Sequence, residues 1–175
     1  MVKPPAEPLG LAHGKVKLAD ANPRWAELYA IEAVRLGAAI GSLVVDIQHF
    51  GSTSIVGIKA KPIIDILIGL QRFEDGEGLV APMLALGYDY VGVEVVPNDH
   101  LFGKGVVRTH LAHAVLHDGH HWRRNLRFRD RLRADAALRA GYQRLKVELA
   151  AQFPDNRAAY TAAKAEFIDR IADAS

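Results

Sequence analysis

The stretch that decides the fold is residues 49–68, HFGSTSIVGIKAKPIIDILI. The β-branched, apolar run at 43–47 that precedes it is typical of a buried strand, and the small residues at 51–54 end that strand in a turn. A second strand is predicted from Ile63, because Pro62 can precede a central strand but cannot continue it. The stretch therefore indicates two strands of one sheet, joined by a small-residue turn and a short connector.

Asp65 lies in the second predicted strand, among isoleucine and leucine residues. Side chains alternate along a strand, so Asp65 shares one face with Leu67, while Ile64 and Ile66 share the other. Burying a carboxylate costs free energy unless a cation, a metal or hydrogen bonds compensate for it. Two interpretations stay open: Asp65 belongs to a binding site, or the turn amides or Lys61 satisfy it. We favour the site, since buried carboxylates on core strands tend to mark one.

The turn itself carries residue types that bind anions. Glycine lets a ligand approach the backbone closely, and free amides and hydroxyls donate hydrogen bonds to phosphate. We therefore predict phosphate contacts from the four turn residues Gly51, Ser52, Thr53 and Ser54. Lys61 is expected to neutralise phosphate charge beside them. The same hydroxyls also suit turn formation and helix capping, and both roles can hold at once.

These residues carry a resemblance to a known family. A Gly-Ser turn followed by an acidic residue on a hydrophobic strand resembles the nucleotidyltransferase-fold signature, whose strand bears two carboxylates one residue apart. A longer match, which resembles the GrpB family (UPF0157), consists of His49-x-Gly51-Ser52-Thr53-Ser54, Lys59-Ala60-Lys61-Pro62 and Ile63-Ile64-Asp65-Ile66. That family shares the fold, and some members are fused to dephospho-CoA kinase. The resemblance extends over residues 18–172.

The resemblance implies a nucleotide or other phosphate-bearing ligand, with Mg²⁺ as the cofactor. In active nucleotidyltransferases, paired carboxylates hold divalent metals that bridge the phosphates and the attacking hydroxyl. Here Leu67 stands at the position of the second carboxylate, which leaves Asp65 alone on its strand. That departure puts standard two-metal transfer in doubt.

Histidines gather between residues 110 and 121, and the resemblance selects His113 among them. It lies nine residues before Trp122, which matches a strand motif of GrpB proteins, where related folds place an acidic ligand. The resemblance therefore implies that Asp65 and His113 are the catalytic residues and the metal ligands. A histidine bonded within the sheet, and a zinc or nickel site built from several histidines, are the alternatives. His49, beside the turn, is expected to line the same cleft.

Six arginines fall within residues 123–133, in a segment predicted to be helical. The run Arg127-Phe128-Arg129-Asp130 resembles a segment of the GrpB family, and we expect Arg129 or Arg133 to reach a phosphate bidentately. A basic helix also suits RNA, although no recognisable reader motif accompanies it. A solvated helix face is the remaining interpretation.

Composition narrows the possible classes of protein. The 175 residues contain no cysteine, which excludes disulfides, thiolate metal sites and cysteine nucleophiles. No apolar run approaches the length of a membrane span, and the first residues lack the apolar core of a signal peptide. We therefore expect a cytoplasmic protein with no membrane partner. The sequence does not indicate an oligomeric state.

The other segments are assigned by periodicity and turn chemistry: helices at 23–40, at 78–86 and from Trp122 onward, and a long-looped hairpin over 88–116. Residues 1–14, rich in proline, glycine and alanine, are predicted to be a mobile arm, and residues 15–175 a single domain. Strands in the middle and helices on both sides predict an α/β (α+β) fold, with a mixed central sheet and a helical C-terminal region.

Two functions of different classes follow. The first is an enzyme that binds a nucleotide with Mg²⁺ and transfers a nucleotidyl group to an unknown acceptor. Ser52 and Thr53 would hold phosphate, Asp65 the metal, and His113 would assist. The second is a non-catalytic module that binds a nucleotide or a coenzyme A-related ligand, which the apolar residue Leu67 favours. The enzyme would release pyrophosphate, whereas the binding module would not.

Overall fold

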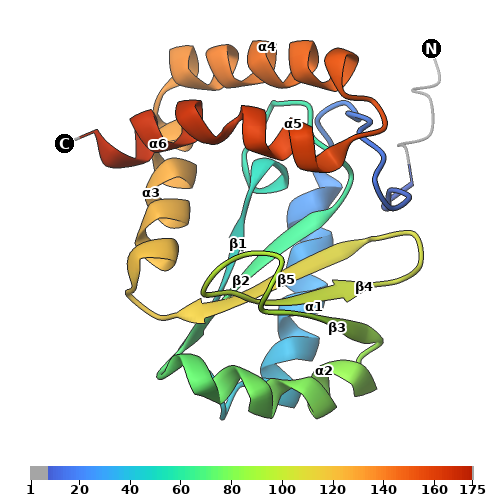
Figure 1. The fold of residues 1–175 in the computed structure, drawn as a ribbon, viewed down its shortest axis with the longest axis vertical. Helices are drawn as coiled ribbons and strands as arrows, with labels where there is room; N and C mark the ends of the chain where they lie inside the picture. Colours follow the sequence, from blue (N-terminus) through green and yellow to red (C-terminus); the bar gives the residue numbers. More distant parts are fainter. Residues whose placement is uncertain (1–7, 175) are drawn as a thin grey trace.

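A five-stranded mixed sheet runs through the middle of the chain in the order β1-β2-β5-β4-β3 (Figure 1). The structure is a computed structural model and describes residues 8–174. The strands are β1 (Asp46–Phe50), β2 (Ile64–Leu70), β3 (Tyr88–Gly92), β4 (His100–Lys104) and β5 (His110–Leu116). β2 and β5 are parallel, and the other neighbours are antiparallel. The predicted mixed sheet is thus confirmed.

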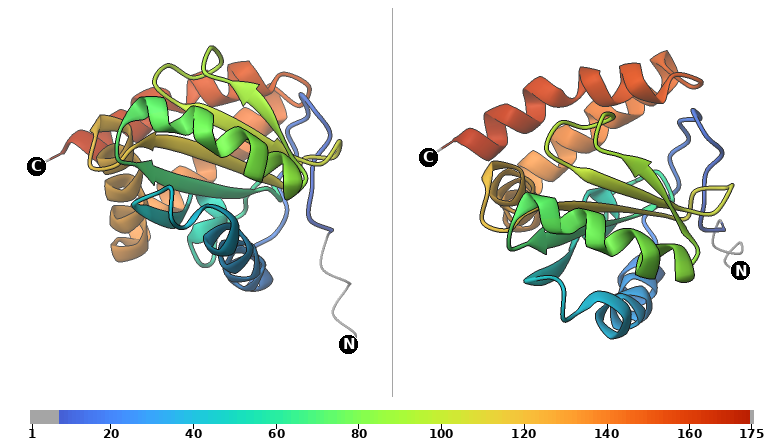
Figure 2. Two further views of the ribbon diagram at one scale, coloured as in Figure 1. Left: turned by 90° about the horizontal axis from the view of Figure 1, so that it is seen from below. Right: turned by 60° about the horizontal axis from the view of Figure 1, so that its bottom comes forward.

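Helices cover both faces of this sheet, so the fold has three layers (Figure 2). One face packs against α1 (Arg24–Ile40) and α2 (Val80–Ala85). The other carries the C-terminal helices α3 (His120–Ala134), α4 (Ala136–Gln152), α5 (Arg157–Ala163) and α6 (Ala165–Asp173). Two short 3₁₀ helices, η1 (Ser52–Ser54) and η2 (Phe73–Leu79), lie in the connections. The α/β class predicted from the sequence is confirmed.

The two faces of β2 differ in chemistry, as the alternation of its side chains predicts. Ile64, Ile66 and Ile68 are fully buried in the main core, against residues of α1 such as Leu36 and Ile40. Each such side chain stabilises the fold by roughly 1.5–3 kcal/mol through its burial. Asp65, the polar residue of the same strand, points to the opposite face, toward the C-terminal helices.

The parallel pairing of β2 with β5 brings the predicted site residues to one face. Asp65 is the register partner of Leu111, and Leu67 is the partner of His113. Partners in register project to the same side of a sheet. Asp65 and His113 therefore both lie on the face covered by the C-terminal helices, one step apart along the strands.

Helix boundaries agree well with the periodicity of the sequence. Helix α1 covers Arg24–Ile40, against the predicted range 23–40. Helix α5 begins after Pro154, and its cap is Asn156: the side-chain Oδ1 accepts a hydrogen bond from the Ala159 amide at 3.0 Å. Asp135 caps α4 in the same way. These caps satisfy amides that a helix leaves without an internal partner.

Three sequence-based assignments are wrong. The first strand covers Asp46–Phe50 rather than 43–47, because pairing with β2 selects the residues next to the turn. The predicted hairpin over 88–116 is a meander of three strands, since His100–Lys104 forms β4 in what was predicted to be a turn. Its glycine, Gly103, sits where a Cβ atom would overlap the guanidinium of Arg108. Close packing of the Arg108 side chain over β4, not a turn, accounts for this glycine.

The third correction concerns the N-terminal arm. Residues 1–7 of the predicted mobile segment lie outside the described residues. The following residues are attached to the sheet: the Gly10 amide donates to the carbonyl of Pro62 at 2.7 Å, and Leu11 pairs with Arg108. These backbone hydrogen bonds, together with the burial of Leu11, hold the segment in place.

Candidate functional site

The turn after β1 lies directly on the carboxylate of Asp65. Gly51 adopts φ 68°, and a Cβ atom at this position would overlap Oδ2 of Asp65. Only glycine combines this backbone conformation with so close an approach. Burial raises the pKa of Asp65, and the nearby positive charges of His113, Lys61, Lys164 and Arg157 oppose that effect. The predicted convergence of turn, carboxylate and imidazole is therefore present.

Two lysines and an arginine come to Asp65 from different parts of the chain. Lys61 precedes β2, Lys164 lies at the junction of α5 and α6, and Arg157 is the first residue of α5. Burial lowers the pKa of Lys61 to about 8, with repulsion from Lys164 and Arg157 adding to the effect. Burial also lowers the pKa of Lys164 to about 8, although Asp65 raises it. The cations therefore outnumber the carboxylate that they share.

A third lysine, Lys146 of α4, belongs to the same group. Its side chain is buried, and its Nζ donates to the carbonyl of Lys59. Burial lowers the pKa of Lys146 to about 7, and Lys164 and Lys61 lower it further by repulsion. Lys61, Lys146 and Lys164 are named the lysine cluster below. Because each raises the cost of charging the others, the cluster is short of negative charge.

Aromatic rings contact the lysine cluster. The Nζ of Lys164 lies 4.3 Å from the ring centroid of Tyr160, and the Nζ of Lys61 lies 5.5 Å from it. Lys146 lies 4.9 Å from the ring centroid of Tyr142. The negative faces of these rings attract ammonium groups, but each contact contributes only about 0.5–2 kcal/mol and supplies no full negative charge.

The three turn hydroxyls have different partners. Ser52 forms a side-chain hydrogen bond with Tyr142, which moderates the rise of the tyrosine pKa to about 12 that burial causes. The hydroxyl of Thr53 lies 3.0 Å from Nε2 of His49. Ser54 donates to the carbonyl of Gly51 at 2.6 Å and so closes the turn. Of the three, Ser52 is the one directed to the helices that carry the lysine cluster.

The two arginines that were expected to bind phosphate are hydrogen-bonded to the chain around the turn. Arg129 donates from Nη1 to the side chain of Gln48 and to the carbonyl of His49, both at 2.9 Å. Arg133 donates twice to the carbonyl of Ser54, at 2.9 and 3.1 Å. These contacts fasten α3 to the turn, so we leave both arginines out of the phosphate site proposed below.

His49 lies on the other face of the sheet, which corrects the expectation that it lines the cleft. Its ring stacks on Tyr29 of α1 with a centroid distance of 4.5 Å. Burial lowers the pKa of His49 to about 4, and the positive charges of Arg133 and Arg129 act in the same direction. His49 is the register partner of Ile66, so both side chains project toward α1.

Sequence reasoning missed Asp99, which is bonded to His113. The Asp99 side chain is buried, and its Oδ2 lies 2.6 Å from Nδ1 of His113. Burial lowers the pKa of His113, but the charge and hydrogen bond of Asp99 outweigh this effect, and the net shift is upward. Asp99 falls in the segment 97–100, whose Pro-Asn-Asp composition suggests only a turn. Its burial depends on β4, which the sequence did not reveal.

The side chains present do not fit a resident metal centre. Among residues 8–174, no group of three or more His, Cys, Asp or Glu side chains is arranged to hold a metal ion. Mg²⁺ takes six oxygen ligands at close to octahedral geometry and commonly uses one or two carboxylates plus phosphates and water. Asp65 is surrounded by cations rather than by further acids. The expected role of Asp65 as a metal ligand stays a prediction. For His113 that role competes with proton transfer, because Asp99 occupies Nδ1 and only Nε2 is left.

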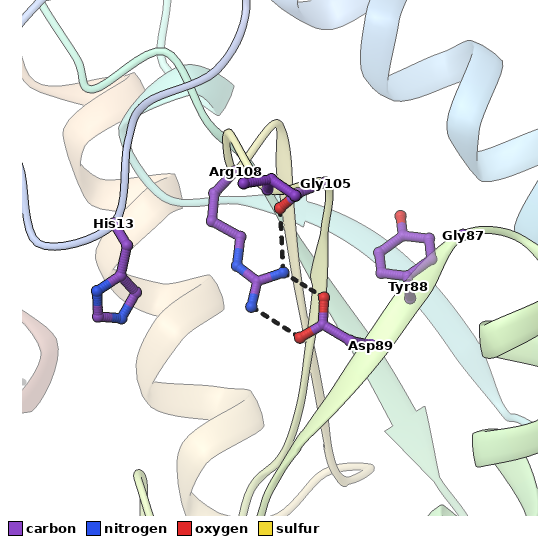
Figure 3. A pocket seen from close by; sticks show the side chains of 7 residues that line it. His13, Gly87, Tyr88, Asp89, Gly105 and Arg108 are labelled. Atoms are coloured by element: carbon purple, nitrogen blue, oxygen red, sulfur yellow. Dashed lines mark hydrogen bonds and ion pairs between the residues drawn. The ribbon is translucent and has the colours of Figure 1, made fainter.

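A hollow with a volume of about 480 Å³ lies elsewhere, beside β3 (Figure 3). Arg108 and Asp89 face each other across it, with Nη2 of the arginine 2.7 Å from Oδ2 of the aspartate. Arg108 also donates to the carbonyl of Gly105 at 3.3 Å. Arg108 and Asp89 neutralise each other in this hollow, whereas the lysine cluster surrounds a single carboxylate.

Comparison with known proteins identifies the family. The GrpB protein family profile matches residues 15–174. The chain belongs to the GrpB family. It is 36% identical over 169 residues to the glutamate-rich protein GrpB of Alkalihalophilus pseudofirmus, covering 93% of this chain and 97% of that protein. It is 38% identical to the UPF0157 protein YqkA of Bacillus subtilis, covering 88% of this chain and 45% of that one.

Solved structures agree with this membership. The crystal structure of the GrpB protein from Enterococcus faecalis is 31% identical in sequence and has a TM-score of 0.81, covering 90% of this chain and 95% of that one. A dephospho-CoA kinase of Mycobacterium bovis is 31% identical over 81 residues, which are 45% of this chain and 20% of the kinase. Within the described part of this GrpB chain, no helix is long and apolar enough to span a membrane.

Proposed function

We propose that this GrpB-family chain binds a phosphate-rich anion of the nucleoside triphosphate class between its sheet and its C-terminal helices, and transfers a nucleotidyl group to a hydroxyl acceptor. The observation that carries the proposal is the unbalanced charge around Asp65. Four cationic side chains, those of Lys61, Lys146, Lys164 and Arg157, influence one another or this single carboxylate.

Such an arrangement is costly in the free protein. Burying a cation without a counter-charge disfavours its charged form, which is why the pKa of each lysine falls to about 7 or 8. An anion with several negative charges would restore the protonated lysines and gain their attraction. Perturbed groups gathered in one place around a glycine turn are typical of binding sites rather than of structural ion pairs.

The roles proposed for the chain follow from position. Gly51 lets the carboxylate of Asp65 lie directly against the turn, and Ser52 contributes its hydroxyl beside Tyr142. The lysine cluster holds phosphate oxygens, while Arg157, which donates to the carbonyls of Ala12 and Lys15, adds positive charge beside it. Asp65 orients the lysines that flank it. The expected Mg²⁺ stays a prediction, since the chain supplies few oxygen ligands for it, and no step is assigned to it here.

A binding titration with and without the central cation tests this proposal. Adenosine triphosphate is titrated into the wild-type protein and into Lys164→Met, with binding followed by calorimetry. We expect the affinity of Lys164→Met to be at least about tenfold lower, because one charge-assisted contact contributes roughly 1.5–3 kcal/mol. Arg123→Gln is the matched control, since Arg123 is an exposed cation paired with Asp118 on the surface. Equal affinities in all three proteins would refute the site.

A second function, non-catalytic binding, is favoured by one observation. Leu67 occupies the strand position where the related pattern has its second carboxylate, and it is fully buried. The partial similarity to dephospho-CoA kinase would suit a nucleotide- or coenzyme A-related ligand. In this alternative, adenosine triphosphate raises the melting temperature but no pyrophosphate appears at any protein concentration. Pyrophosphate that accumulates beyond one equivalent per protein chain would exclude it.

A further inference from the structure

Asp99 and His113 form a buried acid–imidazole pair beside the proposed site. Oδ2 of Asp99 lies 2.6 Å from Nδ1 of His113, a short, charge-assisted contact. The Asp99 side chain is 3% exposed and that of His113 is 20% exposed. The pair thus combines a sealed carboxylate with an imidazole that is in part open to solvent. Asp99 is bonded to Nδ1 of His113. The other ring nitrogen, Nε2, has no hydrogen-bond partner among the described residues.

The position of this pair relates to the missing strand carboxylate. Leu67 stands where the second acid of the related strand pattern would be, and its register partner on β5 is His113. The ring of His113 meets Phe50 edge-on, with a centroid distance of 5.3 Å and an interplanar angle of 88°. Phe50 and Leu67 therefore flank the imidazole with apolar surface, which leaves Asp99 to fix its orientation.

Charged and titratable groups surround the pair. The charged and titratable groups that act on His113 are Asp99, Asp65 on β2, Lys61 before β2 and His121 on α3. The second oxygen of Asp99, Oδ1, is buried and has no hydrogen-bond partner among the described residues. A buried carboxylate with one unused oxygen is costly for stability. Within residues 8–174, the contact with His113 is the only hydrogen bond that offsets this cost.

We propose that Asp99 is a positioning residue that holds His113 as the proton acceptor of the transfer, so that an acid–imidazole pair serves the site whose strand lacks a second carboxylate. This inference rests on the proposed function. A carboxylate on Nδ1 fixes the tautomer in which Nε2 is free to accept a proton, and it stabilises the imidazolium that forms.

The step balances with the reactants already named. Nε2 of His113 takes the proton of the acceptor hydroxyl while the oxygen of that hydroxyl attacks the α-phosphorus of the triphosphate. The new O–P bond forms as the bond to the bridging oxygen breaks, and pyrophosphate leaves with that electron pair. The proton on His113 is then released to solvent or to the leaving group. Lys61 of the lysine cluster acts electrostatically on both Asp65 and His113, so the cluster is near enough to attract the departing phosphates.

The experiment compares wild-type protein with Asp99→Asn by two measurements. The first is nitrogen NMR of histidine-labelled protein. In the wild type we expect His113 to carry its proton on Nδ1 with a strongly deshielded resonance, and Nε2 to be unprotonated when the ring is neutral. In Asp99→Asn that resonance should move upfield and the tautomer should change. Asp118→Asn is the control, because this nearby carboxylate is exposed and pairs with Arg123.

The second measurement is pyrophosphate release from adenosine triphosphate with water as the acceptor. We expect Asp99→Asn to lower kcat about 100-fold or more, the usual contribution of a general base, with KM and the calorimetric affinity unchanged. A purely structural role would instead reduce affinity and melting temperature together. Asp99→Glu, which keeps the carboxylate, should restore part of the rate and tests the idea even if the asparagine variant folds poorly.

The outcomes separate this inference from the proposed function. Loss of nucleotide binding in the wild type overturns the proposed function. Binding without any pyrophosphate release removes the transfer, and with it the role of His113 as proton acceptor. Normal release by Asp99→Asn, or a wild-type His113 protonated on Nε2 alone, overturns the role of Asp99 and leaves the binding site standing.

Discussion

The two faces of the sheet each bury a charged cluster, and the clusters are built in opposite ways. On the α1 side, the carboxylate of Glu32 accepts hydrogen bonds from Lys104 at 2.6 Å, Tyr88 at 2.9 Å and Arg35 at 3.1 Å. On the other side, the lysine cluster surrounds a single carboxylate, that of Asp65. The first cluster is complete within the described chain, whereas the second is short of negative charge.

The pKa shifts express the same difference. Although burial alone would raise the pKa of Glu32, its hydrogen bonds from Lys104 and Tyr88 lower it, so the acid is held in its charged form. Burial raises the pKa of Asp65 despite its cationic neighbours. A satisfied network stabilises the fold, and an unsatisfied one is retained for what it binds. This difference indicates that the lysine cluster, rather than the network of Glu32, is the candidate binding site.

The largest effect is expected from breaking the satisfied network. Glu32→Gln leaves Lys104 buried without its counter-charge, so the free energy of unfolding should fall by about 3–5 kcal/mol. Urea denaturation measures this loss. Glu27→Gln is the control on the same helix, since Glu27 is exposed and lies 3.9 Å from Arg24; it should change stability by less than about 0.5 kcal/mol. A small loss in Glu32→Gln would show that the two clusters are alike.

The pH dependence of stability should report the unsatisfied cluster. The folded-state pKa values of Lys146 (about 7) and of Lys61 and Lys164 (about 8) lie below their ordinary value of 10.5. Between these values the unfolded chain binds more protons than the folded one, so stability rises with pH. Each group contributes up to about 1.4 kcal/mol per pH unit in that window.

The melting temperature of the ligand-free protein, measured between pH 7 and pH 9.5, checks the sign of this dependence. A rise is expected, and pyrophosphate should flatten it by keeping the lysines protonated. Lys146→Met should remove part of the rise, because it removes one of the groups that gain protons on unfolding. A melting temperature that falls over the same range would contradict the lowered pKa values of the lysine cluster.

Removing one cation from the lysine cluster should separate binding from stability. In Lys146→Met the affinity for adenosine triphosphate should fall about tenfold, or about 1.4 kcal/mol, while the free energy of unfolding stays within about 1 kcal/mol of wild type. The lost hydrogen bond to the Lys59 carbonyl is offset by relief of repulsion. Calorimetry and urea denaturation measure the two quantities. A large loss of stability with unchanged affinity would make Lys146 a structural residue.

The smallest effect is expected at the arginines that hold the turn. Arg133→Gln loses its two hydrogen bonds to the Ser54 carbonyl, which should cost about 1 kcal/mol of stability, and affinity should fall less than threefold. Thermal unfolding and calorimetry check the two values. A loss of affinity as large as that of Lys164→Met would return this arginine to the phosphate site.

Much of the fold could be predicted because its signals are local. Alternation along β2 placed Asp65 opposite the isoleucine side chains, and periodicity placed the first helix at 23–40, close to the observed Arg24–Ile40. The resemblance also pointed to Asp65 and His113, which the β2–β5 register then brings to one face. These features depend on spacing along short segments, which a single sequence displays.

The rest of the site depends on distant packing. Lys146, Arg157 and Lys164 come from the C-terminal region, and only the packing of that region over the sheet brings them to the site. Asp99 resembled an ordinary turn residue because β4 was not recognised. Arg129 resembled a phosphate ligand because a helix pattern does not tell which backbone it will meet. In each case, contacts between segments distant in sequence determine where the side chain lies.

The order of the chain has a consequence for synthesis on the ribosome. The main core draws its fully buried residues from the span between Ala19 and Ala114, whereas Lys146, Arg157 and Lys164 are translated later. A nascent chain can therefore condense its sheet before the cations arrive. Until α4 to α6 dock, Asp65 stays open to water, and the intermediate is spared the repulsion that the finished molecule carries.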